Sequence, residues 1–165
     1  IKTVPSMRCL VARFHGAYFE APKRWEQFIA RLPPDLHPSE ANGGDFISIV
    51  HDDPGILPPE LLRNTLGVVL PTGWEGDVKA LYVQGLAEMI VEGGPYAAQT
   101  WRGPFTDIHT AYRSFFDTWR RATRYRLAEA PPMEIWRDPP LTLGHVELDL
   151  TIPVEPGINP GTNLT

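Results

Sequence analysis

Hydrophobic and polar positions along the chain follow two periods, which predict short strands together with two amphipathic helices. Residues 7–14 are rich in strand-forming side chains and end near Gly16. Apolar residues then recur at helical spacing between Trp25 and Leu32, where two prolines end the predicted helix. In the second half, a strand is predicted near residues 79–90.

The helix predicted from about Asp107 to Arg124 has the clearest pattern in the sequence, because the placement of its charges and the spacing of its apolar residues both indicate a helix. Asp107 falls in its first turn and arginines gather toward Arg124, as a helix dipole favours. The apolar residues on its predicted inner face are Ile108, Tyr112, Phe115, Phe116 and Trp119.

The same order of features occurs twice, which indicates a duplicated unit. The matched positions, separated by 87, 85 and 82 residues, are Gly16 with Gly103, Asp53 with Asp138, and Pro71 with Pro153. We therefore predict one α+β domain over residues 1–155, a tandem strand–helix–strand–strand duplication with pseudo-two-fold symmetry. Repeat one covers about residues 4–71, repeat two covers about residues 79–154, and a ligand cleft is expected at the seam.

The end of the chain and its overall composition restrict the classes of partner. Residues 156–165 are predicted to be a flexible tail whose deletion leaves the melting temperature nearly unchanged. A net charge of −5 without a lysine or arginine run argues against direct contact with nucleic acid. Neither a signal peptide nor an apolar stretch of roughly 20 residues is evident, so a cytoplasmic protein without membrane contact is expected. Whether a DNA-binding regulator domain precedes Ile1 stays open.

Cysteine and histidine give no indication of a metal or a cofactor. Cys9 is the only cysteine and is expected to pack as a small apolar residue in the first strand. The five histidines are scattered singly, and the chain carries neither a nucleophile elbow, a zinc-protease motif nor a phosphate loop. We expect no metal site, no cofactor and no catalytic residue of a recognised type.

Two carboxylates, Glu147 and Asp149, share one face of the predicted strand over residues 145–152. The first repeat lacks acids at the matching positions. The pair fits either a solvated strand face or the acidic floor of a cavity. On the preceding strand Glu134 and Trp136 share a face, as Gln99 and Trp101 do on the strand before the helix, so carboxylates and indoles could line a common groove.

Several segments resemble the GyrI-like small-molecule-binding family, which includes the effector-binding domains of AraC/Rob-type regulators and of multidrug sensors. The resemblance covers about residues 2–155, and the segments that carry it are Gly93-Gly94-Pro95-Tyr96, Arg102-Gly103-Pro104-Phe105, Ala130-Pro131-Pro132-Met133-Glu134-Ile135-Trp136 and Leu148-Asp149-Leu150-Thr151-Ile152-Pro153-Val154. It implies a ligand cleft at the seam of a duplicated fold.

The resemblance also implies site residues. Family members commonly carry an acid four residues before the proline that ends the last strand, which is Asp149 here, with Glu147 as the alternative. The aromatic walls would come from Trp101, Tyr96, Trp136 and Tyr112, with Glu134 nearby. At least one of the substitutions Asp149→Asn and Glu147→Gln is expected to weaken cation binding by about tenfold.

The function that the resemblance implies is binding of a small, lipophilic, cationic molecule, either by a free-standing binder or by the sensory part of a transcription regulator. Two alternatives follow from other members. The fold is also used by hydrolases of electrophilic small-molecule toxins, for which Tyr96 or Tyr112 with Glu147 would be the pair. It is also used by a gyrase inhibitor, for which the ligand would be a protein partner.

Overall fold

The computed structural model describes residues 1–39, 45–122 and 124–157, so the predicted tail beyond Gly157 lies outside the described residues. Its strands are β1 (Lys2–Val4), β2 (Met7–His15), β3 (Phe46–Val50), β4 (Arg63–Val69), β5 (Ala87–Val91), β6 (Gly94–Pro104), β7 (Tyr125–Leu127), β8 (Met133–Trp136) and β9 (His145–Pro156). Its helices are α1 (Ala21–Arg31), α2 (Val78–Tyr82) and α3 (Ile108–Ala122), with short 3₁₀ turns that include η1 (Tyr18–Glu20) and η4 (Phe105–Asp107). The predicted α+β class is confirmed.

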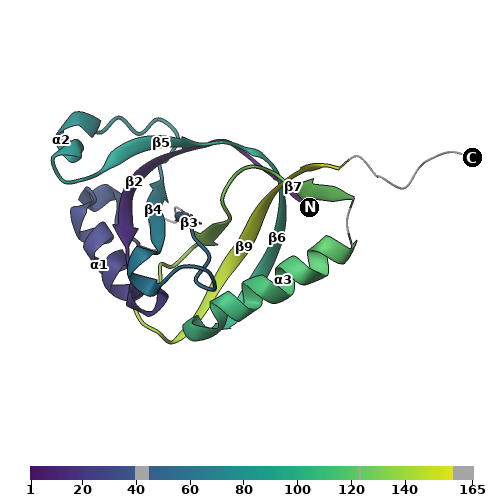
Figure 1. The fold of residues 1–165 in the computed structure, drawn as a ribbon. Helices are drawn as coiled ribbons and strands as arrows, with labels where there is room; N and C mark the ends of the chain where they lie inside the picture. Colours follow the sequence, from purple (N-terminus) through teal and green to yellow (C-terminus); the bar gives the residue numbers. More distant parts are fainter. Residues whose placement is uncertain (40–44, 123, 158–165) are drawn as a thin grey trace, which may run out of the picture.

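The strands form one curled antiparallel sheet with the order β1-β6-β9-β8-β3-β4-β2-β5, and β7 pairs with β9 (Figure 1). In the second half of the chain, neighbouring strands follow the order β6-β9-β8 toward the middle of the sheet. In the first half, β2-β4-β3 follow the same pattern toward the middle from the other side. Pairing of β3 with β8 joins the two halves. A pseudo-two-fold axis between these strands would produce this order, and superposition of the halves is the measurement that would test the duplication.

Matched turns precede the two long helices. Gly16 follows β2 with a φ of +131°, which a side chain would strain, and η1 then leads into α1. Gly103 lies near the end of β6, and η4 then leads into α3. Aromatic residues, Tyr18 and Phe105, stand two positions after these glycines, as the repeat predicts.

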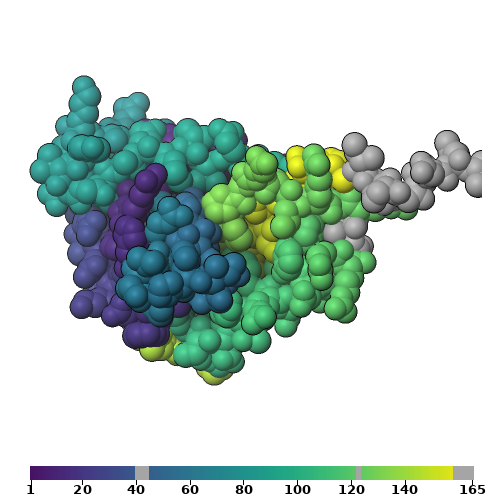
Figure 2. All heavy atoms as spheres, in the orientation of Figure 1, coloured from purple at the N-terminus to yellow at the C-terminus, as the bar shows by residue number. Residues whose placement is uncertain are grey.

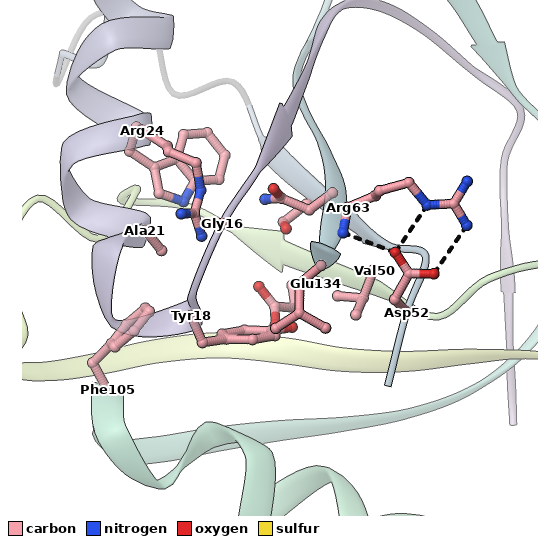
Figure 3. Close-up of a pocket in the computed structure, with 13 residues that line it drawn as sticks. Gly16, Tyr18, Ala21, Arg24, Val50, Asp52, Arg63, Phe105 and Glu134 are labelled. Atoms are coloured by element: carbon pink, nitrogen blue, oxygen red, sulfur yellow. Dashed lines mark hydrogen bonds and ion pairs between the residues drawn. The ribbon is translucent and has the colours of Figure 1, made fainter. Parts of the chain in front are cut away.

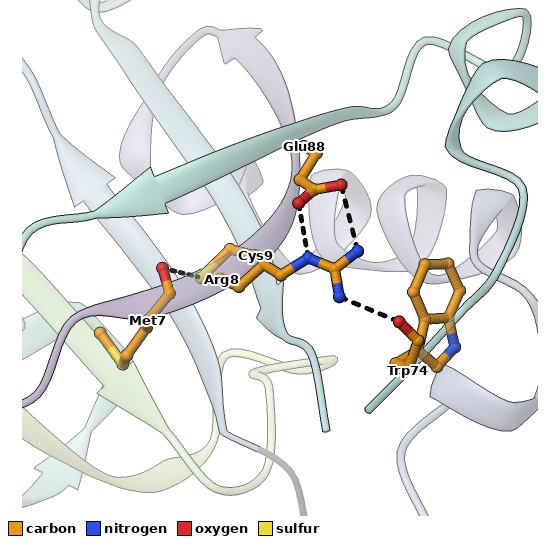
Figure 4. Close-up of polar contacts among 5 residues, drawn as sticks. All are labelled: Met7, Arg8, Cys9, Trp74 and Glu88. Atoms are coloured by element: carbon orange, nitrogen blue, oxygen red, sulfur yellow. Dashed lines mark hydrogen bonds and ion pairs between the residues drawn. The ribbon is translucent and has the colours of Figure 1, made fainter. Parts of the chain in front are cut away.

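The prediction of a single strand near residues 79–90 is wrong, because this segment forms the helix α2 followed by the strand β5. The Asp77 carboxylate caps α2 by accepting a hydrogen bond of 3.1 Å from the backbone N–H of Ala80. Gly85, with a φ of +77°, then turns the chain into β5. Arg8 of β2 holds this segment, since its guanidinium donates to Glu88 of β5 and to the carbonyl oxygen of Trp74 (Figure 4).

The two faces of the sheet bury different cores. The face covered by α1 and α3 packs large aromatic residues, including Trp25, Phe28 and Trp136. The other face packs mostly smaller aliphatic side chains, among them Cys9 with an exposed fraction of 0%. Burial raises the pKa of the Cys9 thiol to about 12, so its predicted packing as a small apolar residue is confirmed. None of the described helices has the length and apolar character that crossing a membrane requires.

Candidate functional site

A cleft of about 420 Å³ opens between the two halves of the fold. One wall is the end of β3 with residues 51–54, the second is α3, and the third is formed by residues 127–132, while Tyr18 and Ile152 also face the cavity. In Figure 2 the surface is hollowed between the blue first half and the green α3, and the yellow of β9 is visible inside. The aromatic side chains in its lining are Tyr18, Tyr112 and Phe116.

Glu134 is a buried acid beside this cleft, with an exposed fraction of 3%. It is paired across the sheet with Ser48 on β3 and Leu150 on β9, so its side chain points to the face that carries the helices. The hydroxyl of Tyr18 donates to Oε1 at 3.3 Å, and the indole N–H of Trp136 donates to Oε2 at 3.2 Å. No described residue forms a salt bridge with Glu134.

The surroundings of Glu134 favour its neutral form. Burial raises the pKa of the carboxyl to about 7, although hydrogen bonds from Trp136, Tyr18 and Ser48 lower it in part. Burial, followed by the nearby Glu134 carboxyl, raises the pKa of Tyr18 and of Tyr112 well above the usual range for a phenol. The Tyr112 hydroxyl is buried near the backbone of Thr151 without a well-formed hydrogen bond. The two phenols that line the cleft, Tyr18 and Tyr112, thus lie close to the buried carboxyl behind them.

A smaller inner cavity of about 20 Å³, which is room for one water molecule, shares Tyr18, Val50 and Asp52 with the cleft. Glu134 lines this inner cavity (Figure 3). Glu134 points toward Tyr18 in this view, and the Arg24 guanidinium descends from α1 on the opposite side. Arg24 is 7% exposed and donates to the carbonyl oxygen of Ala17 at 2.8 Å. Its Nη1 lies 4.0 Å from a carboxylate oxygen of Glu20, but neither Nε nor Nη1 makes a hydrogen bond to a described residue.

An ion pair fixes the wall formed by residues 51–54. Both oxygens of Asp52 accept hydrogen bonds of 2.9 Å from the guanidinium of Arg63, and one also accepts the Arg63 backbone N–H (Figure 3). These contacts, led by the side-chain hydrogen bond, lower the pKa of Asp52 to about 2. The carboxylate therefore stays ionised and committed to Arg63.

The structure brings together three of the residues proposed from sequence, Glu134, Trp136 and Tyr112. Of these, Tyr112 lines the cleft and Glu134 lines the inner cavity. Trp101, paired with Leu148, shares the sheet face of Glu134 and Trp136 but lines neither cavity. The other three predicted residues, Tyr96, Glu147 and Asp149, lie on the opposite face of the sheet, because strand alternation directs Leu148 and Leu150 toward the helices.

The residues on the opposite face have partners of their own. Glu147 accepts a hydrogen bond of 2.6 Å from Arg102, and Tyr96 donates to the carbonyl oxygen of Glu92 at 3.3 Å. Asp149 accepts hydrogen bonds from Thr100 at 2.6 Å and from Lys2 at 3.1 Å. Partial burial opposes ionisation of Asp149, but these two hydrogen bonds give its pKa a net lowering.

Sequence reasoning missed Tyr18, which closes the site from the first repeat. A signal was available, because Tyr18 occupies the repeat position of Phe105 and adds a hydroxyl to that ring. The two acids of the last strand form the stronger local pattern, whereas the cleft takes its walls from both halves.

Comparisons with known proteins agree with this architecture. The model of the GyrI-like small-molecule-binding domain family matches residues 1–155. A DNA gyrase inhibitor of Klebsiella pneumoniae (strain 342) is 30% identical over 117 residues, which cover 67% of this chain and 69% of that protein.

Solved structures share the fold at low sequence identity. EcmrR in its DNA complex has a TM-score of 0.66 at 15% identity, covering 94% of this chain, which spans only 56% of that longer chain. A hydrolase from Listeria innocua has a TM-score of 0.64 at 12% identity, covering 93% of this chain and 89% of the other. SAV2435 bound to tetraphenylphosphonium has a TM-score of 0.56 at 13% identity, covering 93% and 92%. With the family model matched over almost its whole described length, this chain belongs to the GyrI-like small-molecule-binding domain family.

Proposed function

We propose that this domain binds a lipophilic organic cation in the cleft between its two halves, with Glu134 as the counter-ion. The observation that carries the proposal is a buried carboxyl without a cationic partner among the described residues, placed beside an aromatic cleft. A buried acid of this kind is costly to ionise when the cleft is empty, and a bound cation removes that cost. The domain would serve as a free-standing binder or as the sensory part of a regulator.

The walls of the cleft supply the rest of the affinity. The rings of Tyr18, Tyr112 and Phe116 line it, and each aromatic face in contact with a cation contributes about 0.5–2 kcal/mol. Apolar burial of the ligand adds roughly 25 cal/mol per Å². Micromolar affinity, about −8 kcal/mol, is within reach of such a site. The tetraphenylphosphonium bound to SAV2435 on the same fold supports a cation of this class as the ligand.

Charge selectivity tests the proposal directly. Tetraphenylphosphonium and tetraphenylborate have nearly the same shape but opposite charge, so calorimetric titration with each isolates the electrostatic part. We expect the cation to bind at least about tenfold more tightly, roughly 1.4 kcal/mol. Equal affinity for the two ions would show that Glu134 does not act as a counter-ion.

The affinity for the cation should also rise with pH. Only the ionised carboxylate attracts a cation, and the pKa of Glu134 in the empty protein is about 7. Affinity should therefore increase by about tenfold between roughly one pH unit below this pKa and one unit above it. A flat profile for tetraphenylphosphonium would place the cation elsewhere.

Substitution of Asp149 and of Glu147 tests which face of the sheet binds the cation. If Glu134 is the counter-ion, Asp149→Asn and Glu147→Gln should change the affinity for tetraphenylphosphonium by less than about twofold, because both side chains lie across the sheet from the cleft. Weakening by about tenfold in either variant would instead favour the counter-ion role that the family resemblance implies for these acids.

Hydrolysis of an electrophilic small molecule is a second candidate, favoured by the arrangement of Glu134 between two phenols and next to a water-sized cavity. Tyr18 or Tyr112 would donate a proton to the leaving atom while Glu134 activates water. The Listeria innocua hydrolase on the same fold supports this candidate. Mass spectrometry of a cyclopropane-bearing electrophile incubated with the protein and with Tyr18→Phe would detect such turnover.

Binding of a protein partner is the third candidate, because relatives of this chain are DNA gyrase inhibitors. The net charge of −5 suits a contact with a basic surface. Co-purification with gyrase at moderate salt would support this role. Its absence, together with tight cation binding, would leave the small molecule as the physiological ligand.

A further inference from the structure

The rim of the cleft carries a positive charge on α3. His109, Tyr112, Arg113 and Phe116 recur at helical spacing and all line the cleft. Arg113 is exposed, so it lies at the entrance, whereas His109 is half-buried. Neither side chain has a hydrogen bond or an ion pair with any other described residue.

Two acids, Asp52 and Asp53, lie on the opposite wall of the cleft. Asp52 is held by Arg63 through both oxygens. Asp53 accepts the backbone N–H of Gly55 at 2.7 Å, which stabilises the turn that follows β3. Arg113 forms no ion pair with these acids or with any other residue that the structure describes, and it lines the cleft, whereas the buried Glu134 carboxyl lines the inner cavity.

We infer that the preferred ligand is a zwitterion, with its cationic part next to Glu134 and an anionic group held at the entrance by Arg113 and His109. This inference rests on the proposed function, since it assumes that the cation occupies the cleft. A ligand with a positive charge alone would meet an unpaired arginine on entering. A carboxylate at the outer end of the ligand converts that repulsion into a charge-assisted hydrogen bond.

A matched pair of dyes tests this charge pattern. A rhodamine with a free carboxylate on its pendant phenyl ring is a zwitterion at neutral pH, and its methyl ester is a cation of nearly the same shape. Fluorescence anisotropy gives the affinity of the wild-type protein, Arg113→Gln and Arg120→Gln for both dyes. Arg120 is the matched control, because it is also exposed on α3 but does not line the cleft.

We expect Arg113→Gln to weaken the zwitterion by about fivefold while leaving the ester unchanged or slightly tighter. Arg120→Gln should change neither dye by more than about twofold. Equal effects of Arg113→Gln on the two dyes, or equal effects of the two arginine variants on the zwitterion, would overturn the inference.

A further variant separates this inference from the proposed function. If Glu134→Gln weakens both dyes but Arg113→Gln changes neither, the cation site stands and only the anion contact is wrong. If Glu134→Gln changes neither dye, the proposed function itself fails.

Discussion

Replacing Glu134 with glutamine is expected to weaken tetraphenylphosphonium binding by about a hundredfold, roughly 2.7 kcal/mol. Glutamine keeps the size of the side chain and can still accept a hydrogen bond from Tyr18 or Trp136. It removes the negative charge of the buried carboxyl, and the buried position leaves little water to screen that charge. Isothermal titration at a pH above 7, where the wild-type carboxyl is ionised, measures the loss.

Two controls make this result interpretable. Glu26→Gln removes the same charge from an exposed position on α1 and should leave the affinity within about twofold. Tetraphenylborate should bind Glu134→Gln at least as well as the wild type, because the repulsive carboxylate is gone. A folded Glu134→Gln protein that retains full affinity for the cation would refute the counter-ion role.

The same substitution is expected to stabilise the empty protein by an amount that grows with pH. Folding raises the pKa of Glu134 from 4.5 to about 7. Between these values the folded protein holds a proton that the unfolded chain has released, so wild-type stability falls as pH rises through this window. The loss is complete above pH 7 and amounts to about 3 kcal/mol. Glutamine does not titrate, so the variant does not undergo this loss of stability.

Urea denaturation at roughly pH 4 and pH 8 measures this effect as a change in the stability difference between variant and wild type. Any constant consequence of the amide cancels in that comparison, as do the other titrating groups. Glu26→Gln, the same substitution at an exposed position on α1, is the matched control for this comparison. A stability difference that does not change with pH would mean that Glu134 ionises in the folded state as easily as in the unfolded chain.

The local patterns of the sequence predicted the elements that local forces control. The apolar stripe from Ile108 to Trp119 forms α3, because helical periodicity depends only on residues within a few turns. Likewise, the alternation in β9 correctly placed Glu147 and Asp149 on one side of the strand. Between residues 79 and 90 local reasoning failed, since the cap at Asp77 and the turn at Gly85 carried more weight than the apolar content.

The chain alone could not decide which side of each strand meets the cleft. The alternation of side chains along a strand predicts that two residues share a face of the sheet, but it does not predict which face the helices cover. Here α1 and α3 cover the side that carries Glu134 and Leu150, so Glu134 is buried while Glu147 and Asp149 pair with Arg102 and Lys2 on the other side.

The site itself is a product of tertiary structure. Tyr18 and Glu134 are 116 residues apart in sequence and meet only because β3 pairs with β8 at the seam between the halves. The raised pKa of Glu134 could not be predicted from the sequence either, because it depends on the burial that packing of the two halves creates. The sequence by itself determined most of the elements and the family; the packing of the two halves against each other determined which carboxyl is buried beside the cleft.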